Sequence, residues 1–480
     1  MVIRGGRPRN ETPASRTGRR WAASVVAAEH DNLGVTRFAM SRAPTLSDRA
    51  SMWVLVAVVG ILGVAGLKGA TVTRGDAIRS DGISYYLYLP ALFIDRDITL
   101  ERTAARSFGG QIDEVYGVRR VPPRDDLLDV HPVGEAVMLL PFFAVGHLAA
   151  WALGDEMDGF SSPYQVTAEL AGLTYALLGL FLLGSFLRRW FALDVVLIAL
   201  AATTFGTNLF HYATYDATYS HAFSFFLIAL ALVLGARLGD RPGLPLALAM
   251  GATLGLITLT RPTNLVIVSF LALVGVSSRD DARLRVAALW RGRRLLVPGL
   301  AAFLVMLVPQ LVYWHAITGK FFVYSYGDKH DHLDLLRPHL LQVFFGVRKG
   351  LFFWSPILVL ALVGLVLLRR RAPDLFLAAV VFLVLDAWVI ASWGEWSYGD
   401  GFGERPFVEA LPVFAIGLAA FLERMMRARW RRVTFAVVGV LCALSVYTMV
   451  AYWRGNLPKD GTTVRIYLDA FVPGRPLSGN

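Results

Sequence analysis

Charged side chains stand at the ends of several long apolar segments, and four of them could do chemistry. Asp81 begins the stretch Asp-Gly-Ile-Ser-Tyr-Tyr, and Asp216 lies within His-Tyr-Ala-Thr-Tyr-Asp-Ala-Thr-Tyr-Ser-His. Arg261 stands in Leu-Thr-Arg-Pro, and Arg405 follows a glycine-rich loop. Carboxylates can exchange protons or bind hard cations, whereas the planar fork of an arginine suits phosphate oxygens. These residue types could form one site if the fold brings them together.

The elements that must position these residues are membrane helices. Of the 480 residues, 55% are hydrophobic and 17% are charged, and the mean hydropathy is +0.53. Apolar runs recur along the chain, and a spanning helix needs about 20 apolar residues. The short alternating segments of a membrane β-barrel are absent from the sequence. The sequence therefore predicts an all-α polytopic membrane protein.

The net charge of +11 falls mainly in the short segments between apolar runs. The positive-inside rule explains that distribution, so no nucleic-acid partner is expected. Cys442 is the single cysteine, so a disulfide within the chain is excluded, and it lies inside an apolar run.

Twelve apolar runs lie near residues 51–70, 133–153, 167–187, 192–210, 219–237, 244–259, 263–276, 296–316, 351–368, 374–392, 406–422 and 433–452. If all of them crossed, the later basic loops would face outward, against the positive-inside rule. Leaving residues 133–153 at the outer face, as a juxtamembrane or re-entrant helix, returns those loops to the cytoplasm. We therefore predict about eleven transmembrane helices.

This topology sets the domain boundaries. The Arg-rich residues 1–50 are expected to form a disordered cytoplasmic tail, in which Met40 is an alternative start to Met1. Residues 51–452 form the transmembrane domain, including a long external loop at 71–166, and residues 453–480 form an external tail. Loops as long as 71–166 are uncommon without a function.

Each polar residue also has a purely structural interpretation. Asp81 could cap a helix. His211 and His221 could be ordinary interface residues, and Arg261 could reach toward the aqueous boundary. Aromatic residues of the last large loop could anchor it at the membrane interface.

The loop at residues 393–406 favours a ligand. Four glycines interrupt Trp393, Trp396 and Tyr398 before Arg405, which allows close backbone approach to a bound molecule. A metal site is less well supported: Asp95 and Asp97, or His330 and His332, have no fixed ligand spacing.

The order of these residues resembles the GT-C superfamily. Its members are polytopic glycosyltransferases that use polyprenyl-phosphate sugars, and they include the protein O-mannosyltransferase and lipid A aminoarabinose transferase families. There a first transmembrane helix precedes an external loop with the motif Asp-Glu-x-x-Tyr. The matching residues here are Asp81-Gly82-Ile83-Ser84-Tyr85, with glycine in place of the second acid.

Further segments extend the resemblance over roughly residues 51–422. His131-Pro132 resembles the His-Pro or Lys-Pro that opens a juxtamembrane helix in the same loop. Asp216 matches the second external acid, and Leu259-Thr260-Arg261-Pro262 resembles a Leu-Thr-Lys/Arg segment between two short helices.

The resemblance implies an integral membrane glycosyltransferase with an inverting mechanism. Asp81 and Asp216 would be catalytic, with Asp81 as general base on the acceptor hydroxyl. Arg405 and Arg261 would bind the donor phosphate, and Lys320 and Lys349 are weaker candidates. The expected substrate-binding residues are Tyr85, His131, His221, Trp393, Glu395, Trp396, Tyr398 and Glu404.

The resemblance also implies partners and a location. The donor would be a polyprenyl-phosphate sugar and the acceptor a glycan, lipid or protein of the cell envelope. The chain would lie in the inner or plasma membrane among lipids, with its N-terminus in the cytoplasm and its active site on the external, periplasmic face. Gly82 leaves open whether a divalent cation, Mg or Mn, takes part.

Two other classes of protein fit parts of the pattern. A transporter or lipid flippase would account for Asp386 inside an apolar run, although the sequence contains no visible inverted repeat. A non-catalytic assembly component that keeps the fold would account for Gly82.

Overall fold

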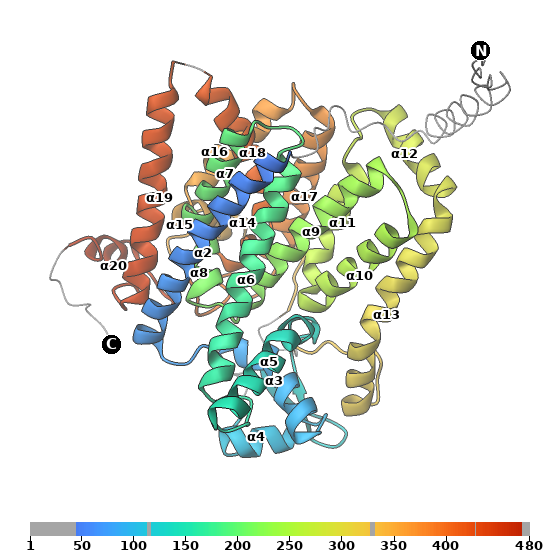
Figure 1. Cartoon of the computed structure of the whole chain (residues 1–480), viewed down its shortest axis with the longest axis vertical. Helices are drawn as coiled ribbons and strands as arrows, with labels where there is room; N and C mark the ends of the chain where they lie inside the picture. Colours follow the sequence, from blue (N-terminus) through green and yellow to red (C-terminus); the bar gives the residue numbers. More distant parts are fainter. Residues whose placement is uncertain (1–44, 113–116, 327–331, 428, 473–480) are drawn as a thin grey trace, which may run out of the picture.

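The computed structural model describes residues 45–112, 117–326, 332–427 and 429–472. Over these residues the chain is an all-α polytopic membrane protein, as predicted (Figure 1). One antiparallel hairpin, β1 (Val118–Val121) with β2 (Asp126–Asp129), is the exception among the described elements.

Seven of the described helices are long and apolar enough to cross a membrane. They are α2 (Leu46–Arg74), α5 (Gly134–Leu153), α6 (Ser162–Leu187), α9 (Ser220–Asp240), α13 (Arg293–Thr318), α17 (Pro373–Ala391) and α19 (Arg431–Trp453). Shorter apolar helices are α7 (Leu193–Phe205), α10 (Leu244–Thr260), η3 (Pro262–Val266) with α11 (Ile267–Leu273), α16 (Ile357–Leu368) and α18 (Leu411–Met426). All twelve apolar runs thus contain helices, and the count of eleven crossings stays a prediction.

The remaining short elements connect these helices. They are α3 (Asp81–Pro90), η1 (Ala91–Asp95), α4 (Glu101–Phe108), α8 (Leu209–Thr214), α12 (Arg279–Arg291), α14 (Leu340–Phe345), α15 (Leu351–Trp354), η4 (Arg405–Val408) and α20 (Val464–Asp469).

The first long helix begins earlier than expected. The Asp48 backbone N–H donates to Oγ1 of Thr45 over 3.1 Å, and the Thr45 N–H donates to Oδ2 of Asp48 over 2.9 Å. This reciprocal cap starts α2 at Leu46, so residues 46–50 are helical and do not belong to a disordered tail. Residues 1–44 lie outside the described residues. Within the predicted C-terminal tail, α20 is helical.

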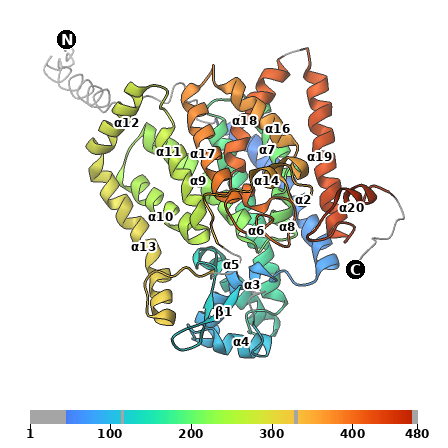
Figure 2. The same cartoon turned by 180° about the vertical axis from the view of Figure 1, so that it is seen from behind.

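The elements after α2 gather at one end of the molecule. Figure 1 shows α3, α4 and α5 together at the end opposite α12, and Figure 2 shows β1 beside them from behind. At the other end, Arg188 pairs with Asp48 over 2.9 Å and ties the start of α2 to the end of α6.

Helix α5 lies beside the first half of α6. The Tyr175 hydroxyl donates to the Met138 carbonyl over 3.0 Å, while Gly146 abuts Tyr164 in the first turn of α6. At its start, α5 touches the last residues of α10, where a Cβ on Gly134 would lie 2.4 Å from a backbone carbon. Helix α5 therefore starts at the end of α10 and runs toward α3 and α4. A position beside α3 and α4 is the one expected if residues 133–153 do not span the membrane, and that interpretation stays a prediction.

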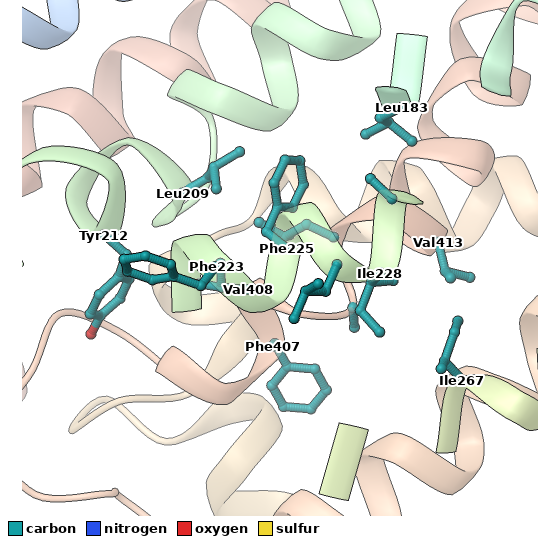
Figure 3. Close-up of a cluster of buried hydrophobic side chains, with 14 of the residues drawn as sticks. Leu183, Leu209, Tyr212, Phe223, Phe225, Ile228, Ile267, Phe407, Val408 and Val413 are labelled. Carbon is teal, nitrogen blue, oxygen red and sulfur yellow. The ribbon is translucent and has the colours of Figure 1, made fainter. Parts of the chain in front are cut away.

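Buried apolar side chains fix the segment that follows Arg405. Figure 3 shows Phe407 and Val408 of η4 among side chains of α9, including Phe225 and Ile228. All four are nearly inaccessible to solvent. Because Phe407 stands two residues after Arg405, core packing limits where that guanidinium can lie.

Candidate functional site

Asp81 is the first residue of α3, and Arg405 lies against it. Nη1 of Arg405 is 2.9 Å from Oδ2 of Asp81, and both side chains are mostly buried. The start of a helix favours a carboxylate because the helix dipole is positive there. The two groups meet as an ion pair without hydrogen-bond geometry, and the buried Nε of Arg405 has no hydrogen-bond partner among the described residues. Arg405 thus retains donors for a ligand.

The charge state of Asp81 follows from two opposing effects. Burial alone would raise the pKa of its carboxyl, but the surrounding positive groups, Arg405 before all others, together outweigh burial and hold that pKa below its ordinary value. Asp81 is therefore ionised at neutral pH, and it is a weak base while Arg405 remains beside it.

Lys349 holds the glycine-rich loop in place. Its buried ammonium donates to the carbonyl of Gly401 and, over 2.5 Å, to that of Lys459. Burial lowers the pKa of Lys349 to about 8. Gly403 has a φ of +63°, which favours glycine, and the Tyr212 hydroxyl accepts from the Phe402 N–H over 3.1 Å. Lys349 is thus occupied by protein carbonyls instead of facing a phosphate.

Arg261 lies where α10 ends. Pro262 cannot continue the helical hydrogen bonds, and the residue before a proline prefers an extended backbone, which Arg261 adopts at φ −151° and ψ 109°. Its Nε lies 3.5 Å from Oε1 of Glu409. The same oxygen lies 3.0 Å from Nδ1 of His221 at the start of α9. Arg261 and His221 thus converge on one buried carboxylate.

Asp216 belongs to a separate buried network. Its Oδ1 accepts from Nη2 of Arg79 over 2.6 Å, and its Oδ2 lies 2.8 Å from Nε2 of His211. Because Nε1 of Trp453 donates to Nδ1 of His211 over 2.9 Å, Nε2 is the nitrogen that carries the proton toward Asp216. Both carboxylate oxygens therefore already accept hydrogen bonds from protein groups.

His131 is fixed by a hydrogen-bonded chain that starts one turn after Asp81. The Ser84 hydroxyl donates to Oδ1 of Asp129, which also accepts the His131 backbone N–H over 2.9 Å. Nδ1 of His131 lies 2.7 Å from the same Ser84 oxygen. With the Ser84 hydroxyl donating to Asp129, the tautomer that completes this chain has Nδ1–H donating to Ser84 and Nε2 as an acceptor. Burial lowers the pKa of His131 to about 4, so the ring is neutral at neutral pH.

The aromatic residues of the glycine-rich loop fall into two groups. Trp393 stacks on Tyr398 with centroids 6.2 Å apart and an interplanar angle of 13°, and Tyr326 meets Trp393 edge-on at 5.2 Å. Trp396 lies under the guanidinium of Arg348, at 5.7 Å. Arg348 also approaches Glu395 to 3.4 Å.

Known proteins offer few comparisons. No protein-family model matches the chain, and no curated protein sequence matches it. Solved structures similar to it include two of the Archaeoglobus fulgidus oligosaccharyltransferase. For the apo form the identity is 14% over 89% of this chain and 58% of that chain, with a TM-score of 0.49. For the complex with Zn and sulfate the values are 14%, 87%, 54% and 0.46. The chain spans little more than half the length of that oligosaccharyltransferase.

The residues around Asp81 do not fit a metal site. Across the described ranges, no three His, Cys, Asp or Glu side chains are grouped so as to hold an ion. A Cβ on Gly82 would lie 2.3 Å from Oγ1 of Thr218, so a second acid has no room there. Asp95 is bound by Arg106, and Asp97 accepts from the backbone of Arg102. His332 is described, whereas His330 lies outside the described residues.

The structure brings only part of the predicted site together. The residues that act on one another electrostatically around α3 are Asp81, Tyr85, His131, Arg261 and Arg405. Tyr85 packs on His131 at 4.2 Å, and its hydroxyl accepts from Ser220 over 3.1 Å. Asp216 has its own partners, and Glu395 and Trp396 lie with Arg348. Glu404 is fully buried, and neither carboxylate oxygen has a hydrogen-bond partner within the described part of the chain.

Sequence reasoning missed several residues of this region. They are Arg79, Ser84, Asp129, Glu135 and Glu409. Each lies within four residues of a residue that the motifs singled out. Glu135 had the clearest signal, because it is an acid at the very start of an apolar run.

Proposed function

We propose that this membrane protein is a glycosyltransferase that moves a sugar from a polyprenyl-phosphate donor to a hydroxyl acceptor. The observation that carries the proposal is the pair of Asp81 and Arg405 at the start of α3. It combines a carboxylate for proton transfer with a guanidinium whose Nε has no hydrogen-bond partner among the described residues. The GT-C-like order of motifs supports this assignment.

The proposed reaction is a single displacement. The acceptor oxygen forms a bond to the anomeric carbon while its proton passes to the Asp81 carboxylate. The bond from the anomeric carbon to the phosphate oxygen breaks, and its electron pair leaves with the polyprenyl phosphate. The configuration at the anomeric carbon is therefore inverted. General base catalysis of this kind contributes about 10² to 10⁴-fold.

Arg405 links donor binding to base strength. A bound phosphate competes with Asp81 for the guanidinium, and a phosphate–guanidinium pair is stabilised by charge-assisted hydrogen bonds. Once that pair forms, Asp81 loses the charge that lowers its pKa and becomes a stronger base. The same guanidinium then stabilises the charge that develops on the leaving phosphate. His131 presents its Nε2 acceptor near this site and is proposed to position the acceptor hydroxyl.

The proposed setting follows from the predicted topology. The end that carries α3, α4 and α5 would be external, and the basic end with α12 would be cytoplasmic. The donor is then reached from the membrane and the acceptor is a glycan, lipid or protein outside it. The described part of the chain supplies no ligand set for Mg or Mn, and the proposed reaction is written without a metal step.

The direct test uses the full chain in nanodiscs with polyprenyl phosphates that carry radiolabelled glucose, mannose, galactose or arabinose. We expect transfer by the wild type to extracted envelope glycans, lipids or proteins, and a loss of at least about 100-fold in Asp81→Asn. Asp125→Asn is the matched control, because Asp125 is 78% exposed in the β1–β2 turn and asparagine tolerates its φ of +62°. Wild-type turnover in Asp81→Asn would remove Asp81 from the mechanism.

Reconstitution into sealed vesicles tests the transporter alternative. A fluorescent polyprenyl phosphate that changes leaflet in reconstituted vesicles, with no sugar transferred, would support a flippase and contradict the proposal.

A further inference from the structure

Three carboxyl groups around Arg261 are buried without enough hydrogen-bond partners. Glu135 is 0% exposed, Glu409 2% and Asp386 4%. Among the described residues, both oxygens of Glu135, Oε2 of Glu409 and Oδ2 of Asp386 lack a partner. A buried polar group left unpaired costs about 1 to 3 kcal/mol. A folded chain rarely keeps four such atoms together without something that satisfies them.

The three groups come from different elements and share one counter-charge. Glu135 stands in the first turn of α5, Asp386 near the end of α17, and Glu409 directly after η4. Glu135 follows Gly134, which touches the backbone of Leu259 and Thr260 just before Arg261, and α17 packs against η3 just after Arg261. For each carboxyl group Arg261 is also the strongest opposing charge. Only Glu409 pairs with it, and then at 3.5 Å. One guanidinium therefore faces three carboxyl groups, which leaves an excess of acceptor oxygens.

The chemistry of this cluster excludes some ligands. An apolar chain would leave the oxygens unpaired, and a phosphate diester, which offers only acceptor oxygens, would add to the excess of acceptors. A ligand with several hydroxyl groups would satisfy them, because a hydroxyl donates to an ionised carboxylate and accepts from a protonated carboxyl group. Tyr326 and Tyr398 also lie close enough to act on Arg261 electrostatically, so aromatic side chains border the same region.

We propose that Glu135, Asp386 and Glu409, arranged around Arg261, form the subsite for a sugar ring and bind its hydroxyl groups. This inference rests on the proposed function and gives its two arginines different roles. Arg405 binds the phosphate of the donor, whereas Arg261 holds the sugar-binding carboxylates in place. Asp386 otherwise favoured the transporter or flippase alternative, and the proposed subsite gives it a role in binding. The sugar could belong to the donor or to the acceptor, since both present the same hydroxyl chemistry.

The test compares two lipids on the full chain in nanodiscs. The probes are bare polyprenyl phosphate and the polyprenyl phosphates that carry glucose, mannose, galactose or arabinose. We expect at least one sugar-bearing lipid to bind the wild type more tightly than the bare lipid. Glu135→Gln and Asp386→Asn should each weaken that lipid about ten-fold and leave bare polyprenyl phosphate unchanged. Asp374→Asn, the same change at the opposite end of α17, should alter neither affinity.

The outcomes separate the sources of the sugar. An unchanged donor affinity with an acceptor KM raised about ten-fold would assign the subsite to the acceptor sugar. If both lipids weaken equally, or neither affinity nor KM changes, the subsite proposal is overturned while the proposed function stands. If the wild type transfers no sugar and binds no sugar-bearing lipid more tightly than the bare one, both proposals fail. Thermal unfolding of each variant identifies any that fails to fold, and Glu409→Gln then serves as the third independent probe.

Discussion

Gly82 shows how one residue limits the chemistry of the site. A Cβ at this position would lie 2.3 Å from Oγ1 and 3.1 Å from the carbonyl oxygen of Thr218. That hydroxyl also donates to the Ala77 carbonyl over 2.8 Å, so it cannot turn away without losing its partner. The missing second acid of the motif is thus a packing requirement of this chain.

We expect Gly82→Ala to destabilise the protein by about 1 to 3 kcal/mol through overpacking. Thermal unfolding in detergent measures the effect. Adding Thr218→Gly to Gly82→Ala should recover part of the loss, because it removes the colliding side chain. An unchanged midpoint in Gly82→Ala would contradict the close contact.

The pair of Asp81 and Arg405 predicts a pH effect. Transfer requires an ionised Asp81, so kcat/KM for the donor should fall as the pH drops through the pKa of that carboxyl. Arg405 lowers this pKa, and Arg405→Gln should therefore raise it and move the acid limb of the profile to higher pH. Arg348→Gln, which removes an arginine bound to Asp460, should leave the acid limb in place. An acid limb that does not move in Arg405→Gln would separate Asp81 from the observed ionisation.

At the scale of elements, the loop that carries Arg405 is held in place by Lys349, a residue that lies outside the loop in the sequence. That ammonium joins the carbonyls of Gly401 and Lys459, which come from different segments. The sequence marked Lys349 only as a weak phosphate candidate. The local sequence around Lys349 does not predict which carbonyls surround its ammonium, because Gly401 and Lys459 are far from it in the sequence.

Lys349→Met should leave the buried Gly401 carbonyl without its lysine donor and remove one of the two donors to the Lys459 carbonyl, at a cost of about 1 to 3 kcal/mol. It should also raise the donor KM, since the loop would no longer fix Arg405. Lys320→Met is the control for stability, because Lys320 is exposed. A Lys349→Met variant as stable as the control would show that the loop is held by its apolar residues alone.

The sequence predicted helices better than it predicted how they break. Apolar runs locate the membrane helices because burial in lipid demands continuous apolar residues. The break at Arg261-Pro262 was visible, since proline ends a helix. The β1–β2 hairpin was not, because its four-residue strands carry no clear alternation. Of the site, Asp81 and Arg405 were both predicted, as general base and phosphate ligand, but the ion pair between them was not. The pairing of Asp216 with Arg79 could not be predicted, because the two residues are 137 positions apart in the sequence.

At the scale of the whole molecule, the two ends differ in character. One end carries α3, α4 and α5 with the candidate site, and the other carries α12 and several basic residues (Figure 1). Arg188 and Arg189 both make ion pairs at the basic end. The positive-inside rule predicts that this end faces the cytoplasm.

Thiol labelling tests this orientation, because Cys442 is the single cysteine. In a Cys442→Ala background, Asp155→Cys, just after α5, should react with a membrane-impermeant maleimide on intact cells. Arg283→Cys in α12 should react only after the cells are opened. Labelling of Arg283→Cys on intact cells, or protection of Asp155→Cys, would reverse the topology or make α5 a crossing helix.

The ion pair at the centre of the candidate site has a consequence for biosynthesis. Asp81 leaves the ribosome with the first fifth of the chain, and Arg405 with the last fifth. No early fragment can hold both groups, so a nascent chain that is still being inserted carries a carboxylate without its guanidinium. Any activity of this site must therefore wait until Arg405 has been synthesised, so shorter nascent chains would not consume the proposed donor.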